Sequence, residues 1–205
     1  MKLLVLDSSG LVASVALIED DQLIAEYTTG NKLTHSQTLL PMLDEVIKRT
    51  SFEIEDIDAV AVAKGPGSFT GLRIGAATAK GLGLALDKPI IPVPTVDGLA
   101  YQLFGTSMII CPMMDARRKQ VYTGFYRFEG SEMKVFLGDG VPVYKEEILE
   151  KMGDLAIFAP AHANRQRAAA VGTLAQVYFA QGIYESADEF VPEYLRKSQA
   201  ERERE

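Results

Sequence analysis

The sequence predicts an α/β protein built from two similar lobes. Apolar runs of strand length alternate with segments of helical periodicity along most of the chain. The opening order is an apolar strand, a terminal acid, a short polar turn and a second apolar strand, and this order begins again near residue 107. The chain has 205 residues, 47% of them hydrophobic, which is enough for one large domain or two small ones with a buried core.

The first half opens with three predicted strands. Only short polar turns separate the runs LLVLD (3–7), ASVALIED (13–20) and QLIAEYTT (22–29), so they are expected to form an antiparallel meander. A helix over 35–50 follows, capped by Thr34 or Ser36, with Pro41 expected to kink or delay its first turns. Its apolar face has helical spacing and comprises Leu39, Leu40, Leu43, Val46 and Ile47.

The rest of the chain continues this alternation. Strands are expected at 58–63, 90–93, 133–137 and 155–159, and helices from about residue 69 to Leu86, over 96–105, around 145–152 and over 164–182. The last helix carries Val171, Leu174, Ala175 and Tyr178 on one face, with Gly182 as its C-terminal stop. The duplication predicts an N-terminal lobe over 1–98, a C-terminal lobe over 99–190 and a tail over 191–205.

Composition excludes several classes of function. The formal net charge of -7 argues against a protein that binds nucleic acid alone, because such affinity comes mainly from Lys and Arg. The one cysteine, Cys111, lies in an apolar run, so no internal disulfide is expected and a reducing compartment fits best. No signal-peptide core and no run of about 20 apolar residues occurs, so the protein is expected to be cytoplasmic.

A glycine-rich loop, GPGSFTGLR (65–73), has the general shape of a phosphate-binding loop. A Walker loop ends in Gly-Lys-Ser/Thr, but here Leu72 and Arg73 follow Gly71. The dinucleotide fingerprint needs a third glycine where Thr70 stands. Both motifs therefore fail, and the loop is interpreted as a tight turn from strand to helix.

The helix after this loop carries small residues at every fourth position, namely Gly71, Gly75, Ala79 and Gly83. Each interior glycine costs roughly 1 kcal/mol of helix stability relative to alanine. Close approach of a neighbour can offset this cost through dispersion contacts. The neighbour is either another part of the same lobe or another protein, and the sequence alone favours neither.

Two acids, Asp7 and Asp115, each end an apolar strand, where carboxylates of α/β lobes often hold metal or nucleotide. With Ser9 they form a candidate residual nucleotide site, as in an actin-like ATPase. Ala116 and the bulky arginines after it fill the second turn, and LAIFAPAHAN lacks the paired glycines that an adenosine pocket needs. Nucleotide binding is therefore expected to be impaired.

The sequence gives little support for a metal site or for a catalytic nucleophile. The histidines are His35 and His162, and Leu39 stands where a paired metal-binding histidine would follow His35 on a helix, so no metal site is predicted. No serine or cysteine lies in a recognisable nucleophile motif, so no catalytic residue is assigned. The basic cluster at 117–119 is interpreted as a solvated turn.

The motifs LDSSGLVASVAL, HSQTLLPMLDEVI, GPGSFTGLRIGAATAKGLGLAL, PVPTVDGLA, MDARRKQVYTGFY and PEYLR, in this order, closely resemble the bacterial TsaB (YeaZ) family over nearly the whole chain. The resemblance implies a two-lobed actin-like ATPase (ASKHA, ribonuclease H-like) fold with duplicated lobes and a degenerate nucleotide site. It also implies a role in making threonylcarbamoyladenosine on the tRNA base beside the anticodon. In that family the protein is a non-catalytic partner of TsaD, and the ATPase TsaE joins them.

The family also forms homodimers through the first two helices of the N-terminal lobe. Carried over to this chain, the resemblance predicts a partner interface comprising His35, Leu39, Leu43, Val46, Gly71, Arg73, Gly75, Ala79 and Gly83. TsaD-like proteins have a paired-histidine metal motif on the equivalent first helix, of which only His35 remains here. The stretch PAHANRQRAAA departs from the family, where glycines are more usual.

The leading hypothesis is thus a scaffold subunit without cofactor or metal that reaches tRNA only through its complex. The alternative is an ATPase or phosphotransferase of the actin-like class, acting on its own through Asp7, Ser9 and Asp115. A peptidase is a third possibility, but neither a metal-ligand cluster nor an assignable nucleophile supports it.

Overall fold

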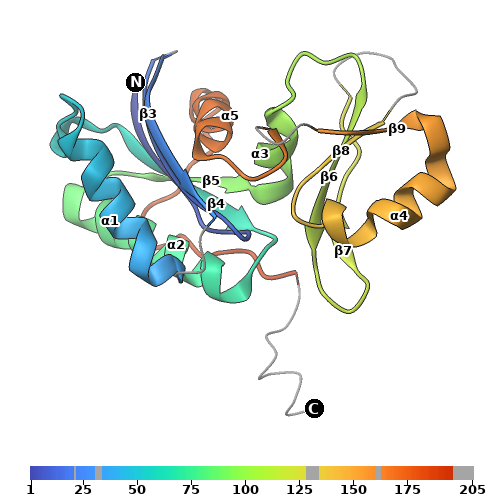
Figure 1. The fold of residues 1–205 in the computed structure, drawn as a ribbon. Coiled ribbons are helices and arrows are strands. Elements are labelled where there is room, and N and C mark those ends of the chain that lie inside the picture. Colours follow the sequence, from blue (N-terminus) through green and yellow to red (C-terminus); the bar gives the residue numbers. More distant parts are fainter. Residues whose placement is uncertain (21, 31–33, 128–133, 160–162, 196–205) are drawn as a thin grey trace, which may run out of the picture.

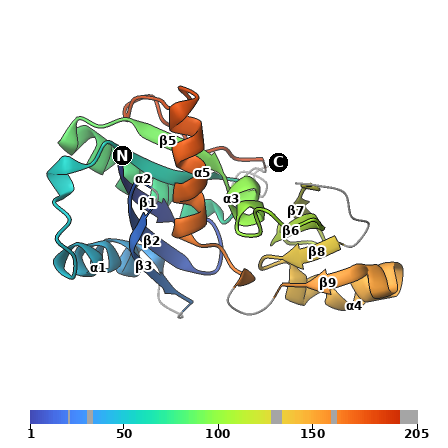
Figure 2. The same ribbon diagram turned by 90° about the horizontal axis from the view of Figure 1, so that it is seen from above.

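Two β-sheets and three layers of helices make up the molecule (Figure 1, Figure 2). The computed structural model describes residues 1–205 except residues 21, 31–33, 128–133, 160–162 and 196–205. Helices α1 (His35–Lys48) and α2 (Phe69–Leu86) cover the outer face of the first sheet, α3 (Thr95–Tyr101) and α5 (Ala168–Ala180) lie side by side between the sheets, and α4 (Val141–Met152) covers the second sheet. This layering is the two-lobed, actin-like α/β fold that the sequence predicts.

The first sheet has the strand order β3-β2-β1-β4-β5. Its strands are β1 (Lys2–Asp7), β2 (Ala13–Glu19), β3 (Gln22–Thr29), β4 (Ala59–Gly65) and β5 (Ile90–Pro94). The first three pair antiparallel, which confirms the predicted meander, and β4 and β5 join parallel to β1. A short 3-10 helix (Ile54–Asp56) precedes β4.

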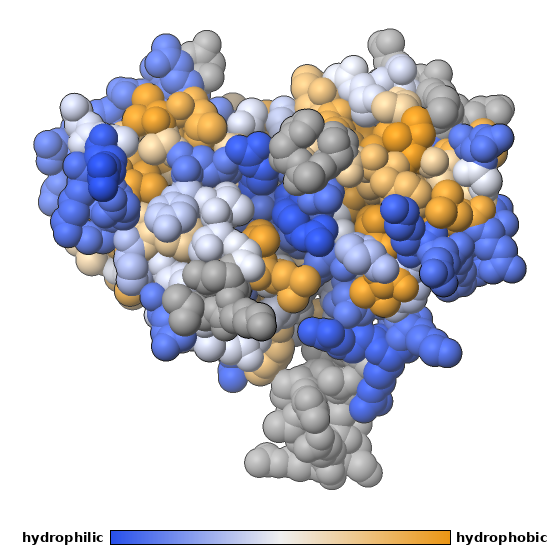
Figure 3. Space-filling view, viewed as in Figure 1, coloured by the Kyte–Doolittle hydropathy of each residue, from blue (hydrophilic) through white to orange (hydrophobic). Residues whose placement is uncertain are grey.

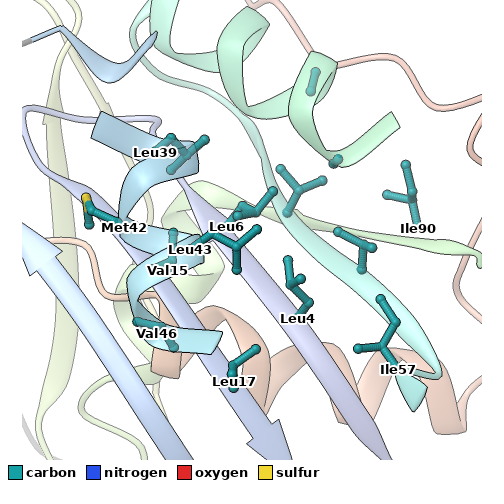
Figure 4. Close-up of a cluster of buried hydrophobic side chains, with 14 of the residues drawn as sticks. Leu4, Leu6, Val15, Leu17, Leu39, Met42, Leu43, Val46, Ile57 and Ile90 are labelled. Carbon is teal, nitrogen blue, oxygen red and sulfur yellow. The ribbon is translucent and has the colours of Figure 1, made fainter. Parts of the chain in front are cut away.

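Both faces of the first sheet are buried, which explains the continuous apolar runs of its central strands. Leu4 and Leu6 of β1 face α1 and α2, in the cluster shown in Figure 4. Leu3 and Val5, one residue out of phase, face α5 on the opposite side. Because side chains alternate along a strand, a run without polar interruption requires helices on both faces.

The second sheet repeats part of this order as β7-β6-β8-β9. Its strands are β6 (Ile109–Asp115), β7 (Val121–Thr123), β8 (Lys134–Leu137) and β9 (Ala156–Phe158). Strand β7 is antiparallel to β6, whereas β8 and β9 are parallel to it, so the four strands correspond to β2, β1, β4 and β5. Packing of α3 on one face and α4 on the other completes the second lobe.

Three predicted helices differ in extent from the observed ones. Helix α4 begins at Val141, four residues before the predicted segment, because Pro142 suits the first turn of a helix. Helix α5 begins at Ala168 and α3 ends at Tyr101, so both are shorter than their apolar patterns. Residue 133 of the predicted strand at 133–137 lies outside the described residues, as do His162 and the end of the predicted tail.

The predicted apolar face of α1 is wrong at Leu40, which is 54% exposed. Leu39, Leu43 and Val46 do point into the core, but Met42 completes the buried stripe in place of Leu40. Positions 39, 42, 43 and 46 follow the i, i+3, i+4, i+7 pattern, and Leu40 lies one step outside it. The helix already begins at His35, so Pro41 does not delay its first turns.

Helix α5 lies in the stretch assigned by sequence to the C-terminal lobe, yet it packs on the first sheet. Gly172 makes this close packing possible, because a Cβ atom at that position would lie 2.3 Å from Ile18 Cδ1 and 2.7 Å from Val5 Cγ2. The division of the chain at residue 98 stays a prediction.

A partly buried hydrogen-bond network joins the two lobes beside α3. Asp97 Oδ1 accepts a hydrogen bond from the Tyr126 hydroxyl at 2.5 Å, and Asp97 Oδ2 accepts one from the Tyr178 hydroxyl at 3.1 Å. Tyr126 belongs to the second lobe and Tyr178 to α5, so one carboxylate holds both. Burial is the main cause that raises the pKa of Tyr178 to about 12, so this hydroxyl stays protonated and donates at neutral pH.

Candidate functional site

A cleft of about 750 Å³ lies between the two lobes, where the sequence places a residual nucleotide site. The turn after β1 and the starts of α1 and α2 form one wall, and the end of β6 with Asp139 forms the other. Hydrophilic residues lie along the boundary between the lobes, whereas hydrophobic residues gather over the upper part of the second lobe (Figure 3). The cleft lining mixes polar residues such as Ser9 and Asp139 with apolar ones such as Leu11 and Met114, so the placement of its few donors and acceptors decides what it can hold.

The serine hydroxyls that could donate to a phosphate are already engaged inside the chain. Ser9 Oγ donates to Asp7 Oδ1 at 2.6 Å, and the Ser9 backbone N–H donates to the same oxygen at 2.9 Å. Ser8 Oγ donates to the carbonyl oxygen of Gly71 at 2.9 Å. These bonds tie the first turn to its own strand and to α2, so the turn offers a phosphate no free hydroxyl.

The opposite wall of the cleft is acidic. Asp139 Oδ1 accepts a hydrogen bond from the Asp115 backbone N–H at 3.1 Å, and Asp115 forms an ion pair with Arg117 at 3.3 Å. Burial raises the pKa of the Asp139 carboxyl, while the hydrogen bond from the Asp115 backbone N–H opposes this rise. Sequence reasoning found Asp115 but missed Asp139, although a strand followed by Gly138-Asp139-Gly140 was a usable signal.

These residues do not fit a bound nucleotide. Carboxylates repel phosphate unless a cation lies between them, and no three His, Cys, Asp or Glu side chains in the described part of the chain are arranged to hold a metal ion. The Arg117 guanidinium, a cation on this wall, forms an ion pair with Asp115. The cleft has the position of an actin-like nucleotide site, and the degeneracy of that site stays a prediction.

Asp7 is fully buried behind Ser9 of the cleft wall, and burial raises the pKa of its carboxyl. A raised pKa in the folded state means that ionisation costs stability, so stability falls as pH rises from about 4 through the folded-state pKa. We expect Asp7→Asn to be more stable than the wild type at pH 7, by about 1.4 kcal/mol per unit of the shift. The gain should disappear near pH 4, and urea unfolding at both pH values measures it. A gain of equal size at both pH values would contradict this prediction.

His35 serves packing rather than metal binding. Its Nε2 is 2.9 Å from the carbonyl oxygen of Gly10, which ties the start of α1 to the turn after β1. The cap of the helix is Thr34, whose backbone N–H donates to Gln37 Oε1 at 3.2 Å. His35 is thus half-buried and lines the cleft, and its assignment to a partner interface stays a prediction.

The glycine-rich loop packs against the chain's own segments. A Cβ atom at Gly67 would lie 2.4 Å from the Ser9 carbonyl oxygen, and Gly65 has a φ of 120° and contacts the backbone of Glu193. The Ser68 backbone N–H donates to Ser9 O at 2.7 Å, and its side chain accepts from Gly71 N at 3.3 Å, which caps α2. The structure therefore places a tight turn here, as the sequence indicates.

The small-residue face of α2 is buried within the same lobe, which corrects the predicted interface. A Cβ atom at Gly71 would lie 2.0 Å from the Ser8 carbonyl oxygen, and one at Gly75 would lie 2.6 Å from Ser8 Oγ. Gly83 packs equally closely against Ala187, and Ala79 is fully buried. The neighbour that needs these small residues is the chain itself.

The interface residues predicted on α1 are also internal, because Leu39, Leu43 and Val46 belong to the core of the first lobe. Arg73 on α2 is exposed, as an interface residue should be. The surface that α1 and α2 present to solvent is formed by other residues. We name this set the α1–α2 face; it comprises Leu40, Pro41, Asp44, Arg73, Ala77, Gly81 and Leu84.

Gly81 is the informative member of the α1–α2 face. It lies inside α2, and no heavy atom of the described residues lies within 4 Å of its ideal Cβ position, so nothing in that part of the chain explains why it lacks a side chain. An exposed glycine inside a helix costs roughly 1 kcal/mol relative to alanine. Leu84, three residues further along α2, is 61% exposed, and Leu40 on α1 is 54% exposed. This face has the small and apolar surface that a closely packed partner needs.

The comparisons with known proteins agree on one family. A family model described as "TsaD: tRNA N6-adenosine threonylcarbamoyltransferase" matches residues 22–141. A Bacillus subtilis protein called "tRNA threonylcarbamoyladenosine biosynthesis protein TsaB" is 30% identical, and the alignment covers 98% of this chain and 96% of that protein. The Escherichia coli protein of the same name is 33% identical over 76% of this chain and 68% of its own length.

Solved structures give the same result. "YeaZ from Pseudomonas aeruginosa" has a TM-score of 0.81 at 26% identity, covering 95% of this chain and 99% of that one. A second Pseudomonas aeruginosa structure, described as similar to peptidase YeaZ, has a TM-score of 0.79 at 27% identity over the same shares of the two chains. No helix among the described residues is long and apolar enough to cross a membrane.

Proposed function

The chain belongs to the TsaB family of tRNA threonylcarbamoyladenosine biosynthesis proteins, and on this premise we propose that it is a non-catalytic subunit that docks a TsaD-type protein through the α1–α2 face. Its task is to hold that subunit in an active arrangement. We further propose that a TsaE-type ATPase joins the complex, that tRNA is reached only through it, and that the complex works in the cytoplasm.

The observation that carries this proposal is Gly81. Its missing side chain has a cost in helix stability and no benefit within the chain, whereas a partner helix can use the gap for close backbone approach. Ala77 lies one turn away and is also exposed, so the gap extends along the helix. The other glycines of α2 are explained by contacts inside the lobe and lend the proposal no support.

The proposal also rests on the chemistry of the cleft. Both serines of the first turn are engaged internally, and the opposite wall carries the carboxylates Asp115 and Asp139, whose charge disfavours a phosphate. These features favour a subunit that contributes contacts rather than a reaction. The same α1–α2 face can pair two copies of the chain, so we expect a homodimer in isolation that dissociates when the TsaD-type subunit binds.

Association with a TsaD-type subunit tests the proposal directly. We expect a one-to-one complex by size-exclusion chromatography with light scattering, and a dissociation constant measurable by calorimetry. Absence of a complex between the two purified wild-type proteins would overturn the proposed function.

We expect the isolated chain to bind no ATP. Calorimetric titration with ATP and Mg²⁺ should give only the heat of dilution, because the hydroxyls of the first turn are engaged internally and the opposite wall is acidic. A TsaD-type protein titrated in the same buffer is the positive control. Micromolar binding by this chain, abolished by Asp115→Asn, would favour an actin-like ATPase or phosphotransferase instead.

A further inference from the structure

The end of the chain forms a strap alongside α2. We define the C-terminal strap as residues 185–195, which follow α5 and precede the residues outside the description. It starts at the free edge of the first sheet, where Glu185 and Ile90 exchange two backbone hydrogen bonds of 2.8 and 2.9 Å. It then passes Gly83 near the end of α2 and reaches Phe69 at the start of α2, so it follows the helix in the reverse direction (Figure 1).

The strap is anchored along its whole length. Ala187 packs against Gly83, and Phe190 is buried in the core of the first lobe. Lys80 Nζ donates hydrogen bonds to the carbonyl oxygens of Asp188 and Phe190 at 3.0 and 3.1 Å. The Glu193 backbone N–H donates to the Lys64 carbonyl oxygen at 2.7 Å. These contacts fix the backbone of the strap, so they also fix the directions of its remaining side chains.

The side chains that do not anchor the strap are large, apolar and exposed. Val191 is 67% exposed, Leu195 is 59% exposed and Tyr194 is 39% exposed. All three lie within five residues of each other on a backbone that is held in place. Single exposed apolar side chains are ordinary, but a fixed group of them is typical of an interaction surface.

Two side-chain contacts, both made by Phe69, connect this group to the α1–α2 face. The Tyr194 ring lies 5.0 Å from the Phe69 ring, measured between centroids. The guanidinium carbon of Arg73 lies 4.6 Å from the centroid of the same Phe69 ring. Arg73 belongs to the α1–α2 face, so the exposed part of the strap and this face form one continuous surface around the start of α2.

We propose that the C-terminal strap is the third element of the docking surface, and that Val191, Tyr194 and Leu195 contact the same TsaD-type subunit that the α1–α2 face binds. The proposal rests on the proposed function and extends it to a further segment. The occupant is the TsaD-type subunit because the surface is continuous with the face around Gly81, and one rigid partner that covers Arg73 also reaches Tyr194.

The test compares two double variants of the full-length chain. Val191→Ser with Leu195→Ser removes two exposed apolar side chains from the strap and leaves its anchors intact. Leu155→Ser with Ile183→Ser is the matched control, because both side chains are about half exposed and lie outside the strap. We expect the strap variant to bind the TsaD-type subunit at least about tenfold more weakly, and the control to bind within twofold of the wild type.

Photo-crosslinking provides a second readout that does not depend on stability. A benzophenone amino acid at position 191 should form a covalent adduct with the TsaD-type subunit, whereas the same group at position 155 should not. Wild-type affinity in the strap variant, or no adduct at position 191, overturns this proposal. A third variant, Gly81→Arg, tests the α1–α2 face separately, and if it loses binding, that interface stands even when the strap proposal fails. An adduct formed only between two copies of this chain shows that the assigned occupant is wrong. Failure of the wild type to bind instead overturns the proposed function.

Discussion

Replacing Gly71 with alanine is expected to destabilise the protein by roughly 3 kcal/mol or more, although alanine is the better helix former. The new Cβ atom would lie 2.0 Å from the carbonyl oxygen of Ser8, and that oxygen belongs to a backbone that cannot rotate away. The turn after β1 must therefore move, which breaks the hydrogen bond from Ser8 Oγ to Gly71 O. Urea unfolding followed by circular dichroism measures the loss.

The matched control for this prediction is Gly81→Ala on the same helix. No atom lies near its Cβ position, so the substitution should raise stability by up to about 1 kcal/mol through helix propensity. The same chemical change thus has opposite signs at two positions ten residues apart. Equal effects at Gly71 and Gly81 would show that the packing of α2 described above is wrong.

Replacing Gly81 with arginine is expected to weaken association with a TsaD-type subunit roughly a hundredfold, while the isolated chain stays folded. Arginine is a good helix former, and solvent surrounds the position in a single copy of the chain. In the complex the long side chain would occupy the space that a partner helix needs, and its charge would have to be desolvated. Isothermal titration calorimetry gives the affinity, and a thermal melt of the free variant verifies its fold.

Two controls define the meaning of this result. Gly81→Ala adds only a methyl group, so its affinity should lie between those of the wild type and Gly81→Arg. Lys151→Gln on α4 changes a charge on the far lobe and should leave affinity unaltered. Unchanged binding by Gly81→Arg would remove the α1–α2 face as the docking surface.

The structure of α2 shows how far sequence reasoning reaches. The four-residue spacing of Gly71, Gly75, Ala79 and Gly83 correctly indicates a face that a neighbour approaches closely. Spacing carries no information about which neighbour this is, because the Ser8 turn is distant in sequence and close only in the fold. The exposed surface without large side chains around Gly81 could not be predicted, because one glycine and one alanine form no repeat in the sequence.

The same distinction between local and distant contacts explains which strands, helices and site residues could be predicted from the sequence. The strands of the first sheet were predictable because their apolar runs are set by burial on both faces. The placement of α5 on that sheet was not, since it depends on Gly172 meeting Ile18 and Val5 across the fold. Ser9 and Asp115 do border one cleft, with Asp7 buried behind Ser9, but the internal hydrogen bonds of these residues, which disfavour a phosphate there, are visible only in the structure.

The central claim is that this chain acts through docking and not through chemistry in its own cleft. A reconstituted tRNA threonylcarbamoyladenosine assay with TsaD-type and TsaE-type subunits tests it most directly, with Gly81→Arg and Asp115→Asn compared against the wild type. The account predicts that modification is lost with Gly81→Arg, recovers when that variant is supplied in large excess, and proceeds at the wild-type rate with Asp115→Asn. Full modification with Gly81→Arg together with loss in Asp115→Asn would contradict it.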